Sequence, residues 1–312
     1  MKAAQINSYG GPEVLEVNLN TPKPTPKDNQ VLLEVHAASI NPFDVAVRRG
    51  YLQKMKALEF PVILGGDFAG VVTQVAENVS DFKVGDEVYG SSNLFNGGSG
   101  SFAKYTVANT INTAFKPKSV NFNQAAALPL VGSSAVQALE EHMKLQKEQK
   151  ILIHGGAGGI GHIAIQLAKA LGAYVVTTVS TDDKALAKSL GADEVIDYKN
   201  QAFEEILKDF DAVFDTVGGE TTNKSFKVLK KGGVIVSMLG QPDRQLAQKF
   251  GVIAIGQATK NNTQHLSRLA ELVDSGKIKV TVDKTFPLDQ VKEAFSYFET
   301  KRPKGKVVLK IK

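Results

Sequence analysis

A glycine-rich segment in the middle of the chain has the residue types and spacing of a phosphate-binding loop. Gly156, Gly158 and Gly161 form the pattern GxGxxG within residues 153–161. Glycines at these places let the backbone turn sharply and approach a pyrophosphate, and the helix that follows offers unpaired N–H groups to the anion. The residues expected to contact a bound dinucleotide are Gly156, Gly158, Gly159, Ile160 and Gly161.

The segments around this loop alternate between strand and helix patterns, which is the context that the motif requires. The candidate strands are 150–154, 174–179, 194–198, 211–217, 232–239 and 250–256. The candidate helices are 160–171, 183–190, 202–208 and 220–229. This alternation predicts an α/β fold with a doubly wound parallel sheet, the Rossmann type. A further helix at 262–274 is expected to close it.

The two ends of the chain have β character instead. Short β-branched runs at 31–35, 70–75 and 87–89 are separated by turn residues, and β character returns from Val280 to the last segment, 306–312. The sequence therefore predicts two domains. Residues 1–122 and 280–312 form a β-rich domain, and residues 123–279 form the dinucleotide-binding domain.

The composition excludes several classes of function. The chain has 312 residues and no cysteine, which excludes disulfides, a thiolate zinc site and a catalytic cysteine. Its 37 basic and 32 acidic residues give a net charge of only +5, so we expect no nucleic-acid partner. No apolar run reaches the roughly 18 residues of a membrane span, and the N-terminus does not have the pattern of a signal peptide. We expect a cytoplasmic protein with a small-molecule substrate.

The second strand of the predicted sheet ends in neutral residues, which bears on the choice of cofactor. An NAD-binding fold usually has an acid about twenty residues after the glycine loop to hold the ribose hydroxyls. Here that place falls at Ser180, and Lys184 follows one helical turn later. This favours NADPH, whose 2′-phosphate suits a cation. Asp182 and Asp183 stand close by, so an inward-facing acid and NADH remain the alternative.

Further motifs resemble those of one enzyme superfamily. The matching segments are 9–15 (YGGPEVL), 38–44 (ASINPFD), 65–72 (GGDFAGVV), 84–90 (VGDEVYG), 125–129 (AAALP), 294–299 (AFSYFE) and 305–308 (GKVV). With the glycine loop they resemble the medium-chain dehydrogenase/reductase superfamily, and most of all its zinc-free quinone oxidoreductase branch. The resemblance implies that the β-rich domain is a GroES-like catalytic domain and that the other is a Rossmann domain.

The resemblance also implies roles for individual residues. Asn41, Pro42 and Asp44 are expected to border the nicotinamide and the substrate, and Val131 to lie along the cofactor. Lys184 and Tyr198 match positions that hold the 2′-phosphate in NADPH-specific relatives. The strand ends of a doubly wound sheet add Val217, Met238, Leu239 and Gly240 to the cofactor site.

Two residues are candidates for catalysis. Tyr51 is expected to donate a hydrogen bond to the substrate oxygen or a proton to the α-carbon. The alternative is that Tyr51 only packs. Asn41 is the second candidate donor. Several relatives have a lysine two residues after the aspartate of Asn-Pro-x-Asp, and this chain has Ala46 there. A mechanism that uses this lysine is therefore not expected.

Zinc is not expected. The zinc-dependent relatives have a cysteine where this chain has Asn41 and a histidine where it has Gly66, and Asp67 alone cannot replace the roughly three protein ligands of a catalytic zinc. We expect an NADPH-dependent oxidoreductase that transfers hydride to quinones or to the β-carbon of α,β-unsaturated carbonyls. The alternative is a non-enzymatic NADPH-binding protein.

Three further expectations concern surfaces and single side chains. The apolar last strand of the sheet, residues 251–255, would be an exposed edge, and relatives pair this edge, so a homodimer is predicted. The lysines of the C-terminal segment are expected to be solvated, with a cofactor-phosphate contact from Lys304 or Lys306 as the alternative. His154 is interpreted as a strand-end residue rather than a catalytic one.

Overall fold

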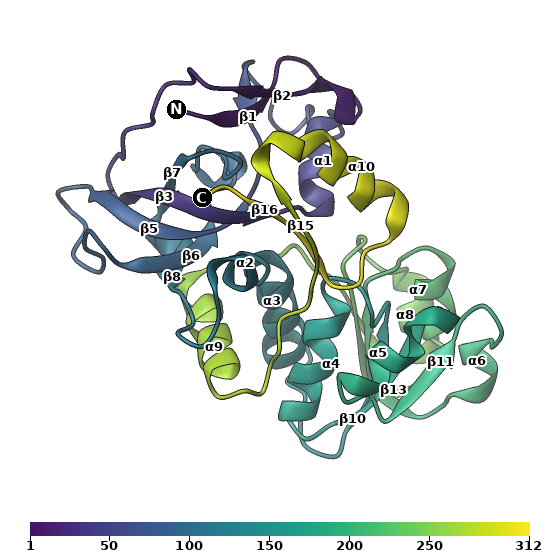
Figure 1. The fold of residues 1–312 in the computed structure, drawn as a ribbon. Coiled ribbons are helices and arrows are strands. Elements are labelled where there is room, and N and C mark those ends of the chain that lie inside the picture. The colour runs from purple at the N-terminus through teal and green to yellow at the C-terminus, as the bar shows by residue number, and fades with distance from the viewer. The chain divides into compact units, whose positions relative to one another are not determined.

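The computed structural model describes residues 1–312 and divides into two compact units. The first unit contains residues 1–130, 261–275 and 280–312. The second unit contains residues 131–260 and 276–279. Figure 1 shows the elements of both units. None of the helices has both the length and the apolar character that crossing a membrane requires.

The second unit is built on a six-stranded parallel sheet with the order β11-β10-β9-β12-β13-β14. Its strands are β9 (Lys150–His154), β10 (Tyr174–Val179), β11 (Glu194–Asp197), β12 (Phe210–Asp215), β13 (Leu229–Ser237) and β14 (Ile253–Gly256). Its helices include α4 (Gly161–Ala170), α5 (Lys184–Ser189), α6 (Phe203–Ile206), α7 (Glu220–Ser225) and α8 (Arg244–Phe250). The chain runs outward from β9 to β11 and then returns to β12, so the strand order reverses beside β9. The predicted doubly wound α/β sheet is confirmed.

The centre of this sheet is apolar on both faces, as expected for strands covered by helices on each side. Ile151, Leu152 and Ile153 of β9 are fully buried. His154 ends the strand and is also fully buried, with Nδ1 2.9 Å from the Thr178 hydroxyl and Nε2 2.9 Å from the Ser225 hydroxyl. Burial lowers the pKa of His154 to about 4, so the ring is neutral and both nitrogens are engaged inside the fold. This arrangement agrees with a structural role.

The first unit contains two β-sheets. A small sheet has the order β2-β1-β4, and the larger has the order β15-β16-β3-β5-β6-β8, with β7 paired to β3. The strands are β1 (Ala3–Ile6), β2 (Leu15–Asn18), β3 (Gln30–Ser39), β4 (Val62–Ile63), β5 (Asp67–Val75), β6 (Glu87–Ser91), β7 (Tyr105–Asn109), β8 (Thr113–Phe115), β15 (Val282–Pro287) and β16 (Lys306–Lys310). The helices are α1 (Pro42–Arg48), α2 (Phe122–Ala126), α9 (Thr263–Asp274) and α10 (Val291–Lys301). The C-terminal strand β16 thus pairs with β3, which brings residues 306–310 beside the start of α1.

Helix α9 does not close the Rossmann sheet as the sequence predicted, because it belongs to the first unit. The Tyr89 hydroxyl donates to the Leu266 carbonyl at 2.5 Å, and the Thr263 hydroxyl lies 3.0 Å from the carbonyl oxygens of Thr110 and Thr113. The helix predicted at 262–274 is present as α9. The sequence does not say which sheet this helix covers. The remaining predicted domain boundaries stay predictions.

Candidate functional site

The glycine loop of the second unit joins β9 to α4 where the strand order reverses, which is the place where open α/β sheets bind their ligands. The N–H groups of Gly155 and Gly156 donate to the Thr178 carbonyl at 3.1 and 3.2 Å, so the loop begins tied to β10. A Cβ on Gly161 would lie 2.2 Å from the Gly155 carbonyl oxygen, and one on Gly156 would lie 2.1 Å from the Thr177 hydroxyl. Only glycine fits at these two positions, and the first turn of α4 therefore stays close to the strand.

Six of the other predicted cofactor residues follow the carboxyl ends of the neighbouring strands. Ser180 follows β10, Tyr198 follows β11, Val217 follows β12, and Met238, Leu239 and Gly240 follow β13. Tyr198, Val217 and Leu239 are apolar or aromatic side chains that remain 49%, 53% and 61% exposed. Exposed apolar groups beside a phosphate loop suit the flat rings of a dinucleotide. Val131 instead lies 4% exposed in α3 (Pro129–Val136).

Sequence reasoning missed an acid at the end of β11. The Asp197 carboxylate accepts from the Thr181 hydroxyl at 2.7 Å and from the Asn200 amide at 2.9 Å, and the Lys184 Nζ lies 3.5 Å away. These partners, led by the Thr181 hydroxyl, lower the pKa of Asp197 to about 2. Asp197 therefore stays ionised and holds Lys184 beside the strand ends, at the start of α5.

Ser180 is also linked to an acid. Its hydroxyl donates to the Asp183 carboxylate at 2.6 Å. A cation from Lys184 and an anion from Asp183 thus both lie next to the residue where the cofactor ribose is expected. Asp182 and Asp183 kept NADH open as an alternative in the sequence. Of these, Asp183 bonds Ser180.

The first unit holds a buried group of polar side chains, here called the Asp67 cluster, formed by Ser39, Asn41, Asp67 and Lys306. One Asp67 oxygen accepts from the Asn41 amide at 2.8 Å and from the Ser39 hydroxyl at 3.0 Å, and the other accepts from the Leu130 N–H at 3.1 Å. Lys306 donates to the Ile40 carbonyl at 2.9 Å and to the Asn41 side-chain oxygen. The Asn41 amide therefore has partners at both its nitrogen and its oxygen.

The cluster places a cation where the sequence predicted a solvated lysine. Lys306 is 2% exposed, and its Nζ lies 3.9 Å from Asp67. Burial raises the pKa of Asp67 and lowers that of Lys306, and their mutual attraction opposes both shifts. The expectation of a solvated Lys306 is wrong, because Gly305 and Lys306 begin a strand that runs against the end of β3. A contact from this buried side chain to a cofactor phosphate has no support.

Asp44 joins the cluster to α1. Its carboxylate accepts from the Asn41 N–H at 2.8 Å and so completes a capping box at the N-terminus of the helix, with Pro42 as the first helical residue. Burial raises the pKa of Asp44 to about 7. A buried acid with this pKa binds a proton near neutral pH, whereas its unfolded form is ionised. This group therefore favours the folded state more at pH 5 than at pH 8.

The residues at the positions compared with the zinc-dependent relatives do not fit a zinc ion. Of Asn41, Gly66 and Asp67, only Asp67 offers a carboxylate, and both of its oxygens already have protein donors. Nowhere in the chain do three or more His, Cys, Asp or Glu side chains gather where they could hold a metal. A catalytic zinc needs about three such ligands.

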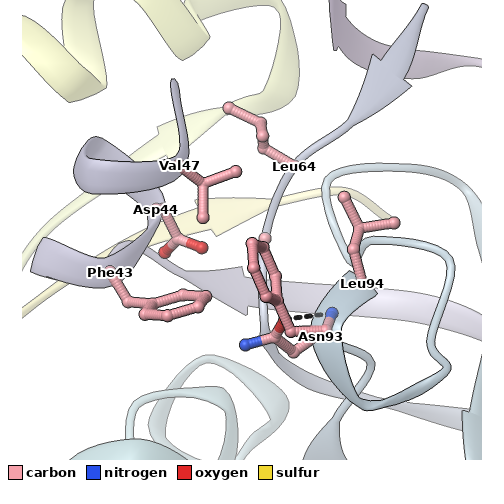
Figure 2. A pocket seen from close by; sticks show the side chains of 8 residues that line it. Phe43, Asp44, Val47, Leu64, Asn93 and Leu94 are labelled. Carbon is pink, nitrogen blue, oxygen red and sulfur yellow. Dashed lines mark hydrogen bonds between the residues drawn. The ribbon is translucent and has the colours of Figure 1, made fainter. Parts of the chain in front are cut away.

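A largely apolar pocket that is open to solvent lies beside α1 (Figure 2), and its outline contains about 220 Å³ that no atom fills. Three of its residues come from α1, two precede β5, and three lie at η2 (Leu94–Asn96) and the residue before it. The lining residues are Phe43, Asp44, Val47, Leu64, Gly65, Asn93, Leu94 and Phe95. Such a pocket suits a small, largely apolar molecule with one or two polar groups.

Tyr51 does not line this pocket. Its side chain is 69% exposed, and its hydroxyl accepts from Arg49 at 3.4 Å. Ala46, where several relatives have a lysine, offers no polar group. The assignment of Tyr51 as a donor stays a prediction, and Asn41 is held inside the Asp67 cluster.

These features place the chain in a known class, and comparisons with known proteins agree. Residues 27–118 match the family model "Alcohol dehydrogenase GroES-like domain", and residues 190–309 match "Zinc-binding dehydrogenase". A 2-methylene-furan-3-one reductase of Solanum lycopersicum is 40% identical, over 99% of this chain and 79% of its own length. An NADPH-dependent alkenal/one oxidoreductase of Arabidopsis thaliana, a chloroplast protein, is 39% identical over the same shares.

Solved structures are similar over the whole chain. The quinone oxidoreductase of Coxiella burnetii has a TM-score of 0.91 at 35% identity, covering 100% of this chain and 99% of its own. The Escherichia coli quinone oxidoreductase complexed with NADPH has a TM-score of 0.88 at 28% identity, covering 100% of both chains. The chain belongs to the medium-chain dehydrogenase/reductase superfamily. Within it, the chain is a member of the quinone and enone oxidoreductase branch, as its motifs indicated.

The Asp67 cluster yields a stability prediction. Lys306→Met removes the cation and leaves a buried carboxylate uncompensated, which should cost about 3–5 kcal/mol and lower the melting temperature by roughly 10 °C. Lys310→Met is the matched control, because Lys310 lies on the same strand but is exposed, and it should change stability by less than about 0.5 kcal/mol. Thermal unfolding followed by circular dichroism measures both. Equal melting temperatures for the two variants would contradict the structural role of Lys306.

Proposed function

We propose that this protein is a zinc-independent, NADPH-dependent oxidoreductase that reduces quinones or the carbon–carbon double bond of α,β-unsaturated carbonyls. The observation that carries the proposal is the apolar pocket beside the Asp67 cluster, a place that has polar donors and no metal-ligand set. The chain is similar to proteins named as alkenal/one, furanone and quinone reductases, and these names describe acceptors of this class.

The second unit has the residues to hold the cofactor. Gly156, Gly158 and Gly161 allow the pyrophosphate to approach the first turn of α4, and Lys184 lies where a 2′-phosphate would be held. When bound, NADPH supplies the hydride that reduces the acceptor. The Escherichia coli relative, which contains NADPH in its crystal structure, has the same fold over its full length.

The residues around Asp67 do not form a zinc-ligand set, and this bears on which kind of reduction suits the site. Reduction of a simple carbonyl concentrates negative charge on one oxygen, which zinc-dependent enzymes stabilise with a Lewis acid. Reduction at the β-carbon spreads the charge over an enolate, which neutral hydrogen-bond donors can stabilise. The apolar lining from Phe43, Leu64 and Phe95 offers a wall for the hydrocarbon part of the acceptor.

The position that receives the hydride tests the reaction. With NADPH deuterated on the transferred face and a simple enone, we expect a saturated ketone with deuterium at the β-carbon, measured by NMR. An allylic alcohol labelled at the carbinol carbon would overturn the proposed chemistry. Tight NADPH binding without turnover of any quinone or enone would instead favour the non-enzymatic alternative.

Lys184 is expected to set the preference for NADPH. Lys184→Ala should raise the KM for NADPH about tenfold, the lower end for a charge-assisted bond because this side chain is 45% exposed. The KM for NADH should hardly change. Lys188→Ala, on the same helix and exposed, is the control. Steady-state kinetics with both cofactors provide the measurement, and an equal loss for NADPH and NADH would contradict the assignment.

We also propose that the protein forms a homodimer through the free edge of β14. This strand ends the six-stranded sheet, and Ile253 is 56% exposed on it. The Gln241 side chain already bonds Ala254 and Gly256 at 3.0 and 3.1 Å, so it covers the C-terminal half of the edge and leaves the half around Ile253 to a partner. Such a location makes pairing between two copies favourable.

Light scattering tests the dimer. Ile253→Lys should convert it to a monomer at micromolar concentration, whereas Ile206→Lys, at a position 53% exposed on α6, should not. A monomeric unmodified protein would refute the proposal.

A cytoplasmic location stays a prediction, since the curated relatives include chloroplast and mitochondrial proteins.

A further inference from the structure

Asn93 is the polar residue of the pocket whose amide nitrogen has no partner in the protein. It lies between the end of β6 and η2, and its side chain is partly buried. Its side-chain oxygen accepts from the Phe95 N–H at 2.8 Å. Its backbone carbonyl accepts from the N–H groups of Asn96 and Gly98, both at 3.0 Å. The residue is therefore held at its backbone and at one side of its amide.

This cap fixes which way the amide points. A rotation that exchanged the oxygen and nitrogen would bring the NH₂ group against the Phe95 N–H, two donors facing each other. The nitrogen must then take the other direction, and Figure 2 shows it on the side of Asn93 where Phe43 lies. The direction of the donor thus follows from the helix cap rather than from a contact in the pocket.

Asn93 is not crowded by the residue that faces it. A Cβ built on Gly66 would make ordinary contacts, 3.8 Å from the Asn93 Cβ and 3.6 Å from the Ser91 hydroxyl. The other polar residue of the lining is Asp44, whose carboxylate is an acceptor for the Asn41 N–H. An acceptor molecule with a carbonyl oxygen fits this arrangement, because its oxygen needs a donor and its hydrocarbon part needs the apolar wall.

We propose that the Asn93 amide is the catalytic hydrogen-bond donor to the carbonyl oxygen of the enone or quinone. The inference rests on the proposed function and names the group that stabilises the charge formed on this oxygen. Asn93 is suited to it because its N–H is oriented before the substrate binds, and a pre-oriented donor in a dry site stabilises developing charge without reorganising. The role is distinct from that of Asn41, whose amide is bonded within the Asp67 cluster.

Asn93→Ser separates the donor from the cap. Serine is a good helix-capping residue, so it keeps an acceptor for the Phe95 N–H. Its hydroxyl is bonded to Cβ, one atom nearer the backbone than the amide nitrogen, so it does not reach the place of the amide N–H. We expect kcat for a simple enone to fall about 10- to 100-fold, with the Kd for NADPH and the melting temperature close to those of the unmodified protein. Asn109→Ser is the matched control, because the Asn109 amide supports the same loop through the Asn96 carbonyl and is outside the pocket.

Steady-state kinetics, a fluorescence titration with NADPH and thermal unfolding give the three readouts. Undiminished kcat in Asn93→Ser overturns the inference, and so does an equal loss of kcat in Asn109→Ser, since the effect would then belong to the loop. The unmodified protein is assayed first with the same enone. If it binds NADPH but turns over no enone or quinone, the proposed function itself has failed, and the inference falls with it.

Discussion

The buried carboxylate of Asp67 is the constraint on which the first unit depends. An ionised carboxylate away from water is costly unless every oxygen has donors and a cation is near. Its partners come from parts of the chain that are far apart: Ser39 at the end of β3 and Asn41 just after it, Leu130 in α3, and Lys306 at the start of β16. A fold that satisfies Asp67 must therefore bring the C-terminal strand against β3. The same contacts hold the first turn of α1. This turn contains Asp44, one of the two polar residues that line the pocket.

The cofactor site of the second unit depends on a different principle, because backbone groups form it. The glycine loop needs no side chain to bind a phosphate; it needs close approach and free N–H groups, and the distances at Gly156 and Gly161 show how little room there is. Side chains act at its margin. Asp197 holds Lys184 near the strand ends, and His154 stays neutral in the core beneath the loop.

This difference explains what the sequence could predict. The strand and helix pattern of the second unit follows from periodicity and from the glycine motif, and the predicted strands agree with β9 to β14 within a few residues at their ends. Lys306, Asp197 and Asn93 were not found because their roles depend on partners distant in the chain. A lysine at the end of a short apolar strand, as Lys306 is before Val307, Val308 and Leu309, has the pattern of a solvated residue. Only the pairing of β16 with β3 shows that this particular one is buried. Helix α9 is a similar case. The helix itself could be predicted from the sequence, but the sheet against which it packs could not.

The two units also differ in how they treat charge. The cofactor edge keeps full charges near water, with Lys184 and Asp183 both partly exposed, as recognition of a phosphate requires. The pocket beside α1 differs at its two polar lining residues: burial raises the pKa of Asp44 to about 7, so this acid binds a proton near neutral pH, and Asn93 is neutral. The cation beside the pocket, Lys56, donates to the Leu94 carbonyl at 2.7 Å. The Asn93 amide offers a donor without adding a charge to the pocket. The chemistry that suits a neutral donor is the one in which charge is spread, and this links the absence of a metal-ligand set to the reduction of conjugated acceptors.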